Sequence, residues 1–440
     1  MKSRRAFIKK SVVAVGGLAL GLSARSYANI MGANDRIHVA FVGCGRRVGG
    51  YFASLAVANN VQLAYLCDVK KSQRDKVAAQ LASKISYTPL LEEDIRKVLA
   101  DKQVDAIFNA TPDHWHAHAT WMAMEAGKHV YLEKPVSHNP REGELLIQFQ
   151  KKYNKVIQVG TQQRSAAHTI DIIREIHNGV IGDPYKALAF YSNQRGRVPN
   201  PVNANVPDGL NWELFQGPAP REAYRHDTWD YNWHWYGWKC GTAETGNNAT
   251  HELDVARWAL QVDYPERVSV EASKQHFVDD GWEMYDTMYA SFYFPKSKTI
   301  HWDGKSRNGL NTYGADRGTI IYGTEGSVFV NRELYRLYSR DGKLIREKRS
   351  DGNEAGTALG GGGDMTDFHV ENFFEAIRGK STVTAPLSEG VKSTLLCHLA
   401  NIGYRTDKAF VLDPITGQSN DKEIKNLWSR EYAPGWEVKG

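Results

Sequence analysis

The chain has 440 residues, of which 42% are hydrophobic and 24% are charged, and its formal charge is +5. A chain of this length usually forms two domains, and this hydrophobic content can fill two cores. Six positive charges and no acidic residue lie within residues 1–28, so subtracting them from +5 leaves −1 for the remainder. This balance argues against a protein that binds nucleic acid or an anionic membrane surface.

Residues 1–28 have the form of an export signal. The run Ser-Arg-Arg-Ala-Phe-Ile-Lys at 3–9 matches the twin-arginine pattern, and an apolar stretch follows at 11–24. Ser26-Tyr27-Ala28 then places small residues at the spacing of a cleavage site. Because the apolar stretch is too short to span a bilayer, we expect export to the periplasm and no membrane association after cleavage.

A strand, a glycine turn and a helix are predicted at the start of the folded chain. An apolar run ends just before Gly43 and Gly45, and a helix-compatible segment follows at 51–58. This order is typical of a Rossmann domain, in which Gly43 would permit the tight turn and Gly45 would let backbone amides approach a pyrophosphate. The third glycine of the usual pattern is replaced by Val48.

Charged residues extend this nucleotide-binding pattern. A second apolar run ends in Asp68, where an acidic side chain binds the ribose hydroxyls of NAD. Arg46 and Arg47 lie in the glycine turn and are further candidate cofactor contacts. Lys70 and Lys71 could instead hold a 2′-phosphate, so the residues favour NAD and leave NADP open.

Residues 35–160 are predicted to form a doubly wound parallel sheet, because apolar strands alternate with helices of crossover length. Further strands are expected at 61–67, 104–110, 129–132 and 156–159, with helices at 72–83, 92–100, 114–126 and 140–153. Ligands of such a sheet bind beyond the carboxyl ends of its strands.

Two of these strand ends carry further candidate site residues. Thr111 and Pro112 follow one strand, with His116 in the next helix, and all three are candidate cofactor contacts. Glu133 and Lys134 follow another strand, immediately before a proline. An ammonium group there could lower the pKa of a substrate alcohol or stabilise the alkoxide that forms as a hydride leaves. A surface lysine at a strand end is the alternative.

Residues 161–440 are assigned to a second, substrate-binding domain. A helix is expected at 164–179 and a strand at 185–192, and a long loop follows at 198–220. The next segment is rich in aromatic residues, including Trp233 and Trp235. These rings either pack a loop onto a sheet or form a platform for a sugar ring.

A helix with a buried stripe is predicted at 253–260. His251 lies in its expected first turn, and Asp254 shares its face three residues later. A histidine that receives a proton suits alcohol oxidation, although a capping or core role is the alternative. Later segments predict strands at 268–302 and 319–330, a mobile glycine-rich loop at 359–364, and helices at 369–379 and 389–405.

The four cysteines show no metal-binding spacing, and no metal site is expected. We interpret them as buried small side chains rather than as a disulfide. They are Cys44, Cys67, Cys240 and Cys397.

Together, the glycine turn, Thr111-Pro112, the Glu-Lys-Pro tripeptide and the helix at His251 resemble the Gfo/Idh/MocA superfamily of sugar and polyol oxidoreductases. This resemblance implies a cis peptide bond after Lys134 and a lysine beside the nicotinamide. It also implies a second domain built on an open, mostly antiparallel sheet, with helices on one face. The family has an Asp-x-x-x-His motif here, and in this chain Asn247 replaces the aspartate while His251 is kept.

These patterns predict a periplasmic NAD(P)-dependent oxidoreductase that acts on a sugar or glycoside with a tightly held cofactor. Lys134, His251 and Asn247 are the candidate catalytic residues, and Arg164, Trp233, Trp235 and Asp254 are the candidate substrate contacts. Two alternatives are an NAD-dependent glycosidase, which oxidises, eliminates and re-reduces, and a non-catalytic carbohydrate-binding protein. A homo-oligomer, either a dimer or a tetramer, is also expected.

Overall fold

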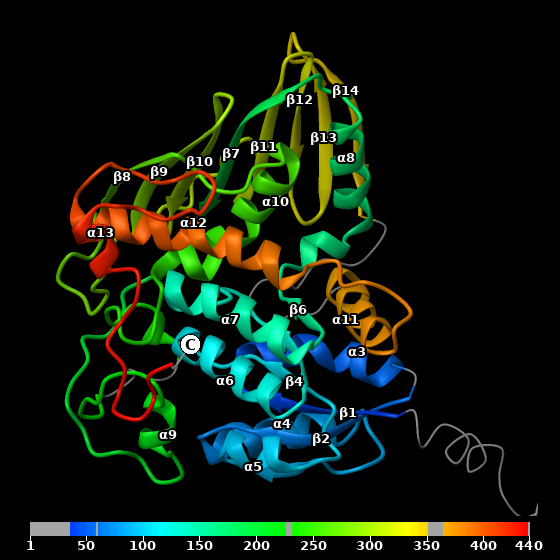
Figure 1. Ribbon diagram of the computed structural model, residues 1–440, viewed down its shortest axis with the longest axis vertical. Helices are drawn as coiled ribbons and strands as arrows, with labels where there is room; N and C mark the ends of the chain where they lie inside the picture. Colours follow the sequence, from blue (N-terminus) through cyan, green and yellow to red (C-terminus); the bar gives the residue numbers. More distant parts are fainter. Residues whose placement is uncertain (1–35, 59, 226–230, 351–363, 439–440) are drawn as a thin grey trace, which may run out of the picture.

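The computed structural model describes residues 36–58, 60–225, 231–350 and 364–438. The predicted export signal and the predicted glycine-rich loop at 359–364 therefore lie outside the described residues, apart from the last position of that loop. Two sheets organise the described chain, one at each end of the molecule (Figure 1). The mixed class, with one parallel and one mostly antiparallel sheet, confirms the predicted fold class.

The first sheet has six strands in the order β3-β2-β1-β4-β5-β6, and every neighbouring pair is parallel. Its strands are β1 (Ile37–Val42), β2 (Val61–Cys67), β3 (Leu90–Glu92), β4 (Ala106–Asn109), β5 (His129–Leu132) and β6 (Ile157–Val159). Its helical segments are the 3-10 helix η2 (Arg46–Tyr51), then α3 (Phe52–Val57), α4 (Lys71–Leu81), α5 (Ile95–Ala100), α6 (Asp113–Glu125) and α7 (Pro140–Tyr153). The central strands are buried on both faces, as the apolar runs predicted.

The helix expected at 51–58 is confirmed as α3, which follows the 3-10 turn η2 that begins directly after Gly45. The predicted start of another helix was wrong. The segment expected to begin a helix at 92 instead ends the short strand β3. Its Leu90 and Leu91 are exposed, because β3 is the edge strand and carries no buried alternating pattern.

The second sheet has nine strands in the order β14-β13-β12-β11-β7-β10-β9-β8-β15. All neighbouring pairs are antiparallel except β7 and β10. The strands are β7 (Pro184–Ser192), β8 (Arg267–Ser273), β9 (Thr287–Phe294), β10 (Lys298–Lys305), β11 (Arg317–Gly323), β12 (Gly326–Val330), β13 (Leu334–Ser339), β14 (Leu344–Arg349) and β15 (Phe410–Val411). The sequence missed β13 and β14, since β14 is exposed and charged and buries no apolar face.

Helices cover the face of this sheet that is turned toward the first sheet (Figure 1). They are α8 (Ala167–His177), α10 (Thr250–Leu260) and α12 (Leu387–Thr406). The remaining helical segments are η3 (Gln162–Ser165), α9 (Trp212–Gln216), η4 (Asn232–His234), η5 (Thr245–Ala249), α11 (Asp364–Ile377) and α13 (Lys422–Asn426).

Helix α11 belongs late in the sequence but packs on the first sheet. Phe373 and Phe374 lie against Phe108 of β4, with ring centroids 5.8 and 6.0 Å apart. The chain therefore returns to the first core after building the second sheet. This return closes one side of the space between the two sheets, where the strand ends of the first sheet lie.

Candidate functional site

A cavity of about 1190 Å³ lies where the carboxyl ends of β1, β2, β4 and β5 face α10 and the loops of the second sheet. Most of the residues singled out from the sequence line it. They are Gly43, Gly45, Arg46, Arg47, Asp68, Thr111, Pro112, His116, Glu133, Lys134, Trp233, Asn247 and His251.

The glycine turn has the shape that a dinucleotide requires. Gly43 has φ +88°, and an added Cβ would lie 2.5 Å from the carbonyl oxygen of Ala110, so only glycine fits. At Gly45 an added Cβ would meet no protein atom within 4 Å. The protein itself therefore does not demand glycine at this second position, but a pyrophosphate approaching the backbone would.

Asp68 is held in place by the turns around it. Its Oδ2 accepts a hydrogen bond from the backbone N–H of Cys44 at 2.7 Å, and its Oδ1 accepts one from that of Lys70 at 2.8 Å. Burial raises the pKa of this carboxyl group, and these two backbone donors oppose the rise. Lys70 lines the cavity, whereas Lys71 forms an exposed ion pair with Asp75 at 2.7 Å.

Glu133 anchors the glycine turn to the end of β5. Its Oε1 accepts hydrogen bonds from Arg47 Nε at 2.6 Å and from the Tyr51 hydroxyl at 2.5 Å. Burial disfavours the charged form, but Arg47 and then Lys134 overcome this effect and lower the pKa of Glu133 to about 2. Arg47 thus neutralises a buried carboxylate, in addition to lining the cavity.

Thr111 and His116 join two of the strand ends. The ring nitrogens of His116 lie 2.8 Å from the carbonyl oxygen of Thr111 and 2.5 Å from that of Pro135. Thr111 in turn donates its hydroxyl proton to Asn109 at 2.7 Å. These contacts fix the turn after β4 relative to the turn after β5, where Lys134 lies.

Lys134 bridges the two halves of the cavity. The peptide bond between Lys134 and Pro135 is cis, as the family resemblance implied. The ammonium group donates a hydrogen bond to the backbone carbonyl of Asn247 at 2.5 Å. Burial lowers the pKa of Lys134, and the negative charges of Glu133 and Asp113 oppose this effect.

Asn247 lies in a π-helical turn, η5, that runs directly into α10. The prediction that His251 lies in the first turn of its helix is confirmed for α10, although helical structure already begins at 243 and continues through η5 into α10. The amide of Asn247 donates to Glu244 Oε1 at 3.2 Å and to the Tyr231 hydroxyl at 3.3 Å. Such π-turns recur at functional sites, because they redirect side chains and carbonyls within a helix.

His251 faces the cavity from the second position of α10. No hydrogen bond joins its side chain to another of the described residues, and the ring is placed where a ligand in the cavity would meet it. Burial holds its pKa well below the usual value, and the positive charges of Arg332 and Lys134 add to that effect. The ring is therefore neutral near pH 7 and able to accept a proton.

Two predicted substrate contacts pair with each other instead. Arg164 donates to both carboxylate oxygens of Asp254 at 2.7 and 2.9 Å, and the two side chains are 7% and 1% exposed. Asp254 also accepts a hydrogen bond from Ser393 at 2.7 Å. This pair ties η3 to α10 and α12 and does not line the cavity, so the prediction for these two residues was wrong.

Trp235 also lies outside the cavity, whereas Trp233 lines it. The ring of Trp235 is buried and stacks on Trp282, with centroids 3.9 Å apart. The aromatic run therefore contains one residue that packs into the core, Trp235, and one that lines the cavity, Trp233. Trp235 has a packing role because it turns into the core beneath the second sheet.

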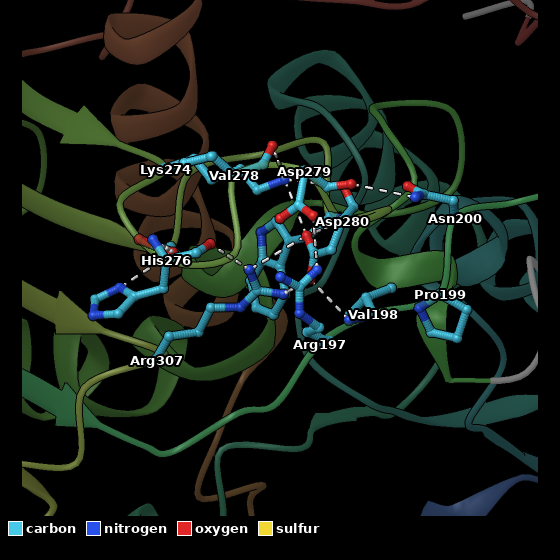
Figure 2. Close-up of polar contacts among 12 residues, drawn as sticks. Arg197, Val198, Pro199, Asn200, Lys274, His276, Val278, Asp279, Asp280 and Arg307 are labelled. Atoms are coloured by element: carbon cyan, nitrogen blue, oxygen red, sulfur yellow. Dashed lines mark hydrogen bonds and ion pairs between the residues drawn. The ribbon is translucent and has the colours of Figure 1, made fainter.

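A polar cluster packs against Trp282, the second ring of this aromatic stack. Arg307 lies 4.5 Å above the ring of Trp282 and donates to Asp280 at 2.5 Å. Figure 2 shows Asp280 between Arg307 and Lys274, with the backbone N–H of Val198 donating to the same carboxylate at 2.8 Å. The cluster fixes the start of the long loop that leads to the aromatic run.

Several cavity residues were missed from the sequence. Arg195 pairs with Glu244 at 3.2 Å, and Arg317 donates to both oxygens of Glu252 at 2.8 and 2.9 Å. Tyr191 and Arg332 are two further examples. Most of these residues lie in or beside strands of the second sheet. Because the sequence does not give the order of those strands, it does not show that these residues share one cavity. His234 also lines the cavity, in keeping with its sequence position between aromatic residues, where a polar side chain could bind sugar hydroxyls.

Other classes of site receive no support from the described part of the chain. No cluster of three or more potential metal-ligating side chains occurs there. The four cysteines are free and buried. Within residues 36–438, as far as they are described, no helix combines the length and the apolar character that crossing a bilayer requires.

Comparison with known proteins gives a family for the first sheet. Residues 37–161 match the Gfo/Idh/MocA oxidoreductase family, which has an NAD-binding Rossmann fold. The D-glucoside 3-dehydrogenase of Escherichia coli K12 is 30% identical over 154 residues, which are 35% of this chain and 42% of that protein. The NAD-dependent scyllo-inositol 2-dehydrogenase of Bacillus subtilis 168 is 24% identical over 67% of this chain and 74% of that protein.

The chain spans about half the length, or less, of the first curated relatives that it matches. Similarity to solved structures covers more of the chain. A levoglucosan dehydrogenase solved with NADH superposes with a TM-score of 0.64 over 86% of this chain and 99% of that one, at 18% identity. At that identity, the superposition shows a shared fold.

Proposed function

We propose that the whole protein oxidises a hydroxyl group of a sugar or glycoside, or reduces the corresponding ketone. Residues 37–161 support this proposal, because they match the NAD-binding Gfo/Idh/MocA oxidoreductase family. The observation that carries this proposal is the shared cavity. The glycine turn, the ammonium group of Lys134 and the neutral ring of His251 all face it. A nucleotide site alone would not need the last two groups.

The residues present fit NAD. The turn at Gly43 and Gly45 would take the pyrophosphate, and Asp68 would accept hydrogen bonds from the adenosine ribose. When bound, the nicotinamide supplies the hydride acceptor or donor. A carboxylate at Asp68 would repel a 2′-phosphate, which favours NAD over NADP.

Lys134 and His251 would handle charge and proton at the reacting oxygen. The ammonium group of Lys134 stabilises negative charge on that oxygen as the hydride leaves. His251 Nε2 or Nδ1 accepts the hydroxyl proton, and its low pKa keeps the accepting form present at neutral pH. Asn247 cannot serve as a base, so the proton transfer is left to His251. The backbone carbonyl of Asn247 instead positions Lys134.

The test has two parts. Purified protein is denatured, and the released nucleotide is identified by mass spectrometry; NAD or NADH is expected. The intact protein is then mixed with a panel of glucosides and inositols, and absorbance at 340 nm follows single-turnover reduction of the bound nucleotide. Absence of any bound nucleotide, or of reduction by every member of the panel, would contradict the proposal. Release of the aglycone would favour the glycosidase alternative.

We further propose twin-arginine export and self-association, neither of which depends on the cavity. Changing Arg4 and Arg5 to lysine should retain the protein in the cytoplasm, and normal periplasmic accumulation would contradict export. The sheet face opposite α10 exposes Tyr289 to 42%, on a strand otherwise well covered. Light scattering during gel filtration should give the mass of a dimer or tetramer, and a monomer would contradict self-association.

A further inference from the structure

Three histidines line the cavity, although the oxidation of one alcohol releases only one proton. Both ring nitrogens of His116 lie against backbone carbonyls, which leaves His234 and His251. His251 is already assigned to that proton in the proposed function. His234 has no assigned task, and it lies in the 3-10 turn η4 between Trp233 and the buried Trp235. Its ring is therefore a candidate for a second proton transfer.

Hydrogen bonding fixes which nitrogen of His234 carries the proton. Nδ1 lies 2.7 Å from the backbone carbonyl oxygen of Tyr231. A carbonyl only accepts, so Nδ1 of the neutral ring carries the proton and the lone pair lies on Nε2. The one hydrogen bond of this ring to a described residue is the one at Nδ1, and His234 lines the cavity, so Nε2 is the nitrogen that a ligand there would meet.

Packing fixes the plane of the same ring. His234 stacks on Trp233, with ring centroids 3.6 Å apart and an interplanar angle of 21°. The ring of Tyr231 also lies close, with its centroid 4.6 Å from that of His234. His234 is therefore held in one orientation, whereas His251 has no hydrogen bond that orients its ring. A fixed orientation and tautomer are what a general base requires.

Electrostatics keeps this ring in its accepting form. Burial holds the pKa of His234 well below its usual value; the Tyr231 carbonyl opposes that effect, and the positive charge of Lys134 adds to it. Lys134 acts on the pKa of His251 in the same direction. The ammonium group of Lys134 and the neutral imidazoles of His234 and His251 therefore share the cavity.

We infer that His234 is a second acid–base residue of this site, which takes a proton from the substrate carbon next to the carbonyl formed by oxidation. This inference rests on the proposed function, because only the oxidised sugar contains that carbonyl. A hydrogen on the neighbouring carbon is acidified by the carbonyl, and a base within the same cavity can remove it.

The step is balanced without a further reactant. The C–H bond breaks, and its proton moves to Nε2 of His234. The electron pair of that bond forms the carbon–carbon double bond of an enolate, while the carbonyl oxygen takes the negative charge. Lys134 stabilises this oxygen as it would stabilise the alkoxide. Return of the proton restores the ketone, and exchange with solvent at Nε2 would exchange the carbon-bound hydrogen.

Deuterium exchange tests the inference directly. The intact protein is incubated in D₂O with a sugar that reduces its bound nucleotide, and with the corresponding ketosugar supplied ready-made. NMR then measures deuterium at the carbons next to the oxidised position. The variant His234→Asn places an amide N–H where Nδ1 donates to Tyr231, but it has no atom in place of Nε2. We expect its exchange rate to fall by about 10²-fold or more, and its single-turnover nucleotide reduction to fall by less than about tenfold.

Two further variants complete the comparison. His251→Gln should show the reverse pattern, with slow nucleotide reduction and a smaller loss of exchange from the supplied ketosugar. His301→Asn, on the sheet face away from α10, should match the wild type in both assays.

Exchange by His234→Asn at the wild-type rate would overturn the inference, and so would a wild-type protein that does not exchange the supplied ketosugar. If no sugar reduces the nucleotide, but the wild type exchanges the supplied ketosugar and His234→Asn does not, the proposed oxidation is contradicted. The role of His234 as a second base is then still supported. The two failures are thus distinguishable.

Discussion

Lys134 Nζ and the backbone carbonyl of Asn247 are 2.5 Å apart, and this hydrogen bond joins the end of β5 to the π-turn that precedes α10. The contact links the sheet that holds the nucleotide turn to the helix that carries His251. It explains how two residues 117 positions apart in the printed sequence, Lys134 and His251, are placed at one cavity. The chemistry proposed for this site depends on that geometry.

Replacing Lys134 should reduce turnover without releasing the nucleotide. Lys134→Met removes the positive charge but keeps a similar volume, and we expect kcat to fall by about 10²-fold or more. The nucleotide content should remain that of the wild type, because the glycine turn and Asp68 lie elsewhere in the cavity. Turnover is measured with the best substrate of the panel, and bound nucleotide by absorbance after denaturation. A variant with wild-type kcat would exclude the role given to Lys134.

Cofactor preference should depend on Asp68. Asp68→Asn removes the negative charge that disfavours a 2′-phosphate, and it keeps one of the two oxygens that accept from the backbone N–H groups of Cys44 and Lys70. We expect the Kd for NAD to rise and the Kd for NADP to fall, as measured by titration calorimetry on nucleotide-free protein. Lys71→Ala is the control, since its ion pair with Asp75 is exposed and away from the cavity. An unchanged ratio of the two affinities in Asp68→Asn would contradict this assignment.

The buried Glu133 should make folding stability depend on acid pH. Its folded pKa is lowered from 4.5 to about 2, so it favours the folded state above pH 4.5 and loses that effect as the pH falls toward 2. The full contribution corresponds to about 3 kcal/mol. The stability gap between wild type and Glu133→Gln should therefore be largest above pH 5 and narrow toward pH 2. Urea unfolding at several pH values measures it, and a gap that is independent of pH would contradict the assignment.

Asp280 should be a major determinant of stability, although it does not line the cavity. Its side chain is 2% exposed and pairs with Arg307, which is fully buried (Figure 2). Asp280→Asn would leave the Arg307 charge in the interior without its ion pair, at a cost of about 3–5 kcal/mol. Asp279→Asn is the matched control, because Asp279 pairs with Arg197 at the surface and its loss should cost far less. Equal melting temperatures for the two variants would contradict this interpretation.

The sequence predicts the nucleotide half of the site better than the substrate half. Gly43, Asp68 and Lys134 each follow a buried apolar run, and parallel strands bring such ends to one edge of a sheet. For these residues, the local sequence pattern therefore predicts where they lie in the folded chain. The substrate half has no such rule, because its residues come from irregular segments whose positions depend on distant contacts.

Trp233 and Trp235 illustrate this limit. They are two positions apart in one aromatic run, yet one lines the cavity and the other stacks on Trp282 in the core. Trp233 lies within the 3-10 turn η4 and Trp235 directly follows it, so neither helical nor strand periodicity indicates which side each one takes. Similarly, the prediction that Asp254 contacts substrate failed because its partner, Arg164, comes from a segment 90 positions earlier.

Asn247 offers the sharpest test of the helix that carries His251, because the resemblance to Gfo/Idh/MocA oxidoreductases implies an aspartate at this position. Its amide donates to Glu244 Oε1 at 3.2 Å. Asn247→Asp would place a second carboxylate against Glu244, and two such groups cannot both be ionised without mutual repulsion. One of them should take up a proton on folding, which raises its pKa in the folded state. The variant should then be close to wild type in stability at low pH and lose stability as the pH rises through that raised value.

We expect the loss to reach about 1–3 kcal/mol at pH 8, with turnover falling in parallel because the carbonyl of Asn247 also holds Lys134. Asn247→Ser is the control, since it removes the donor without adding charge and should shift stability equally at pH 5 and pH 8. Thermal unfolding at both values, with kcat measured alongside, checks the prediction. If Asn247→Asp were as stable as wild type at pH 8, the amide would not be needed to satisfy Glu244, and the family's aspartate could be restored here without a compensating change.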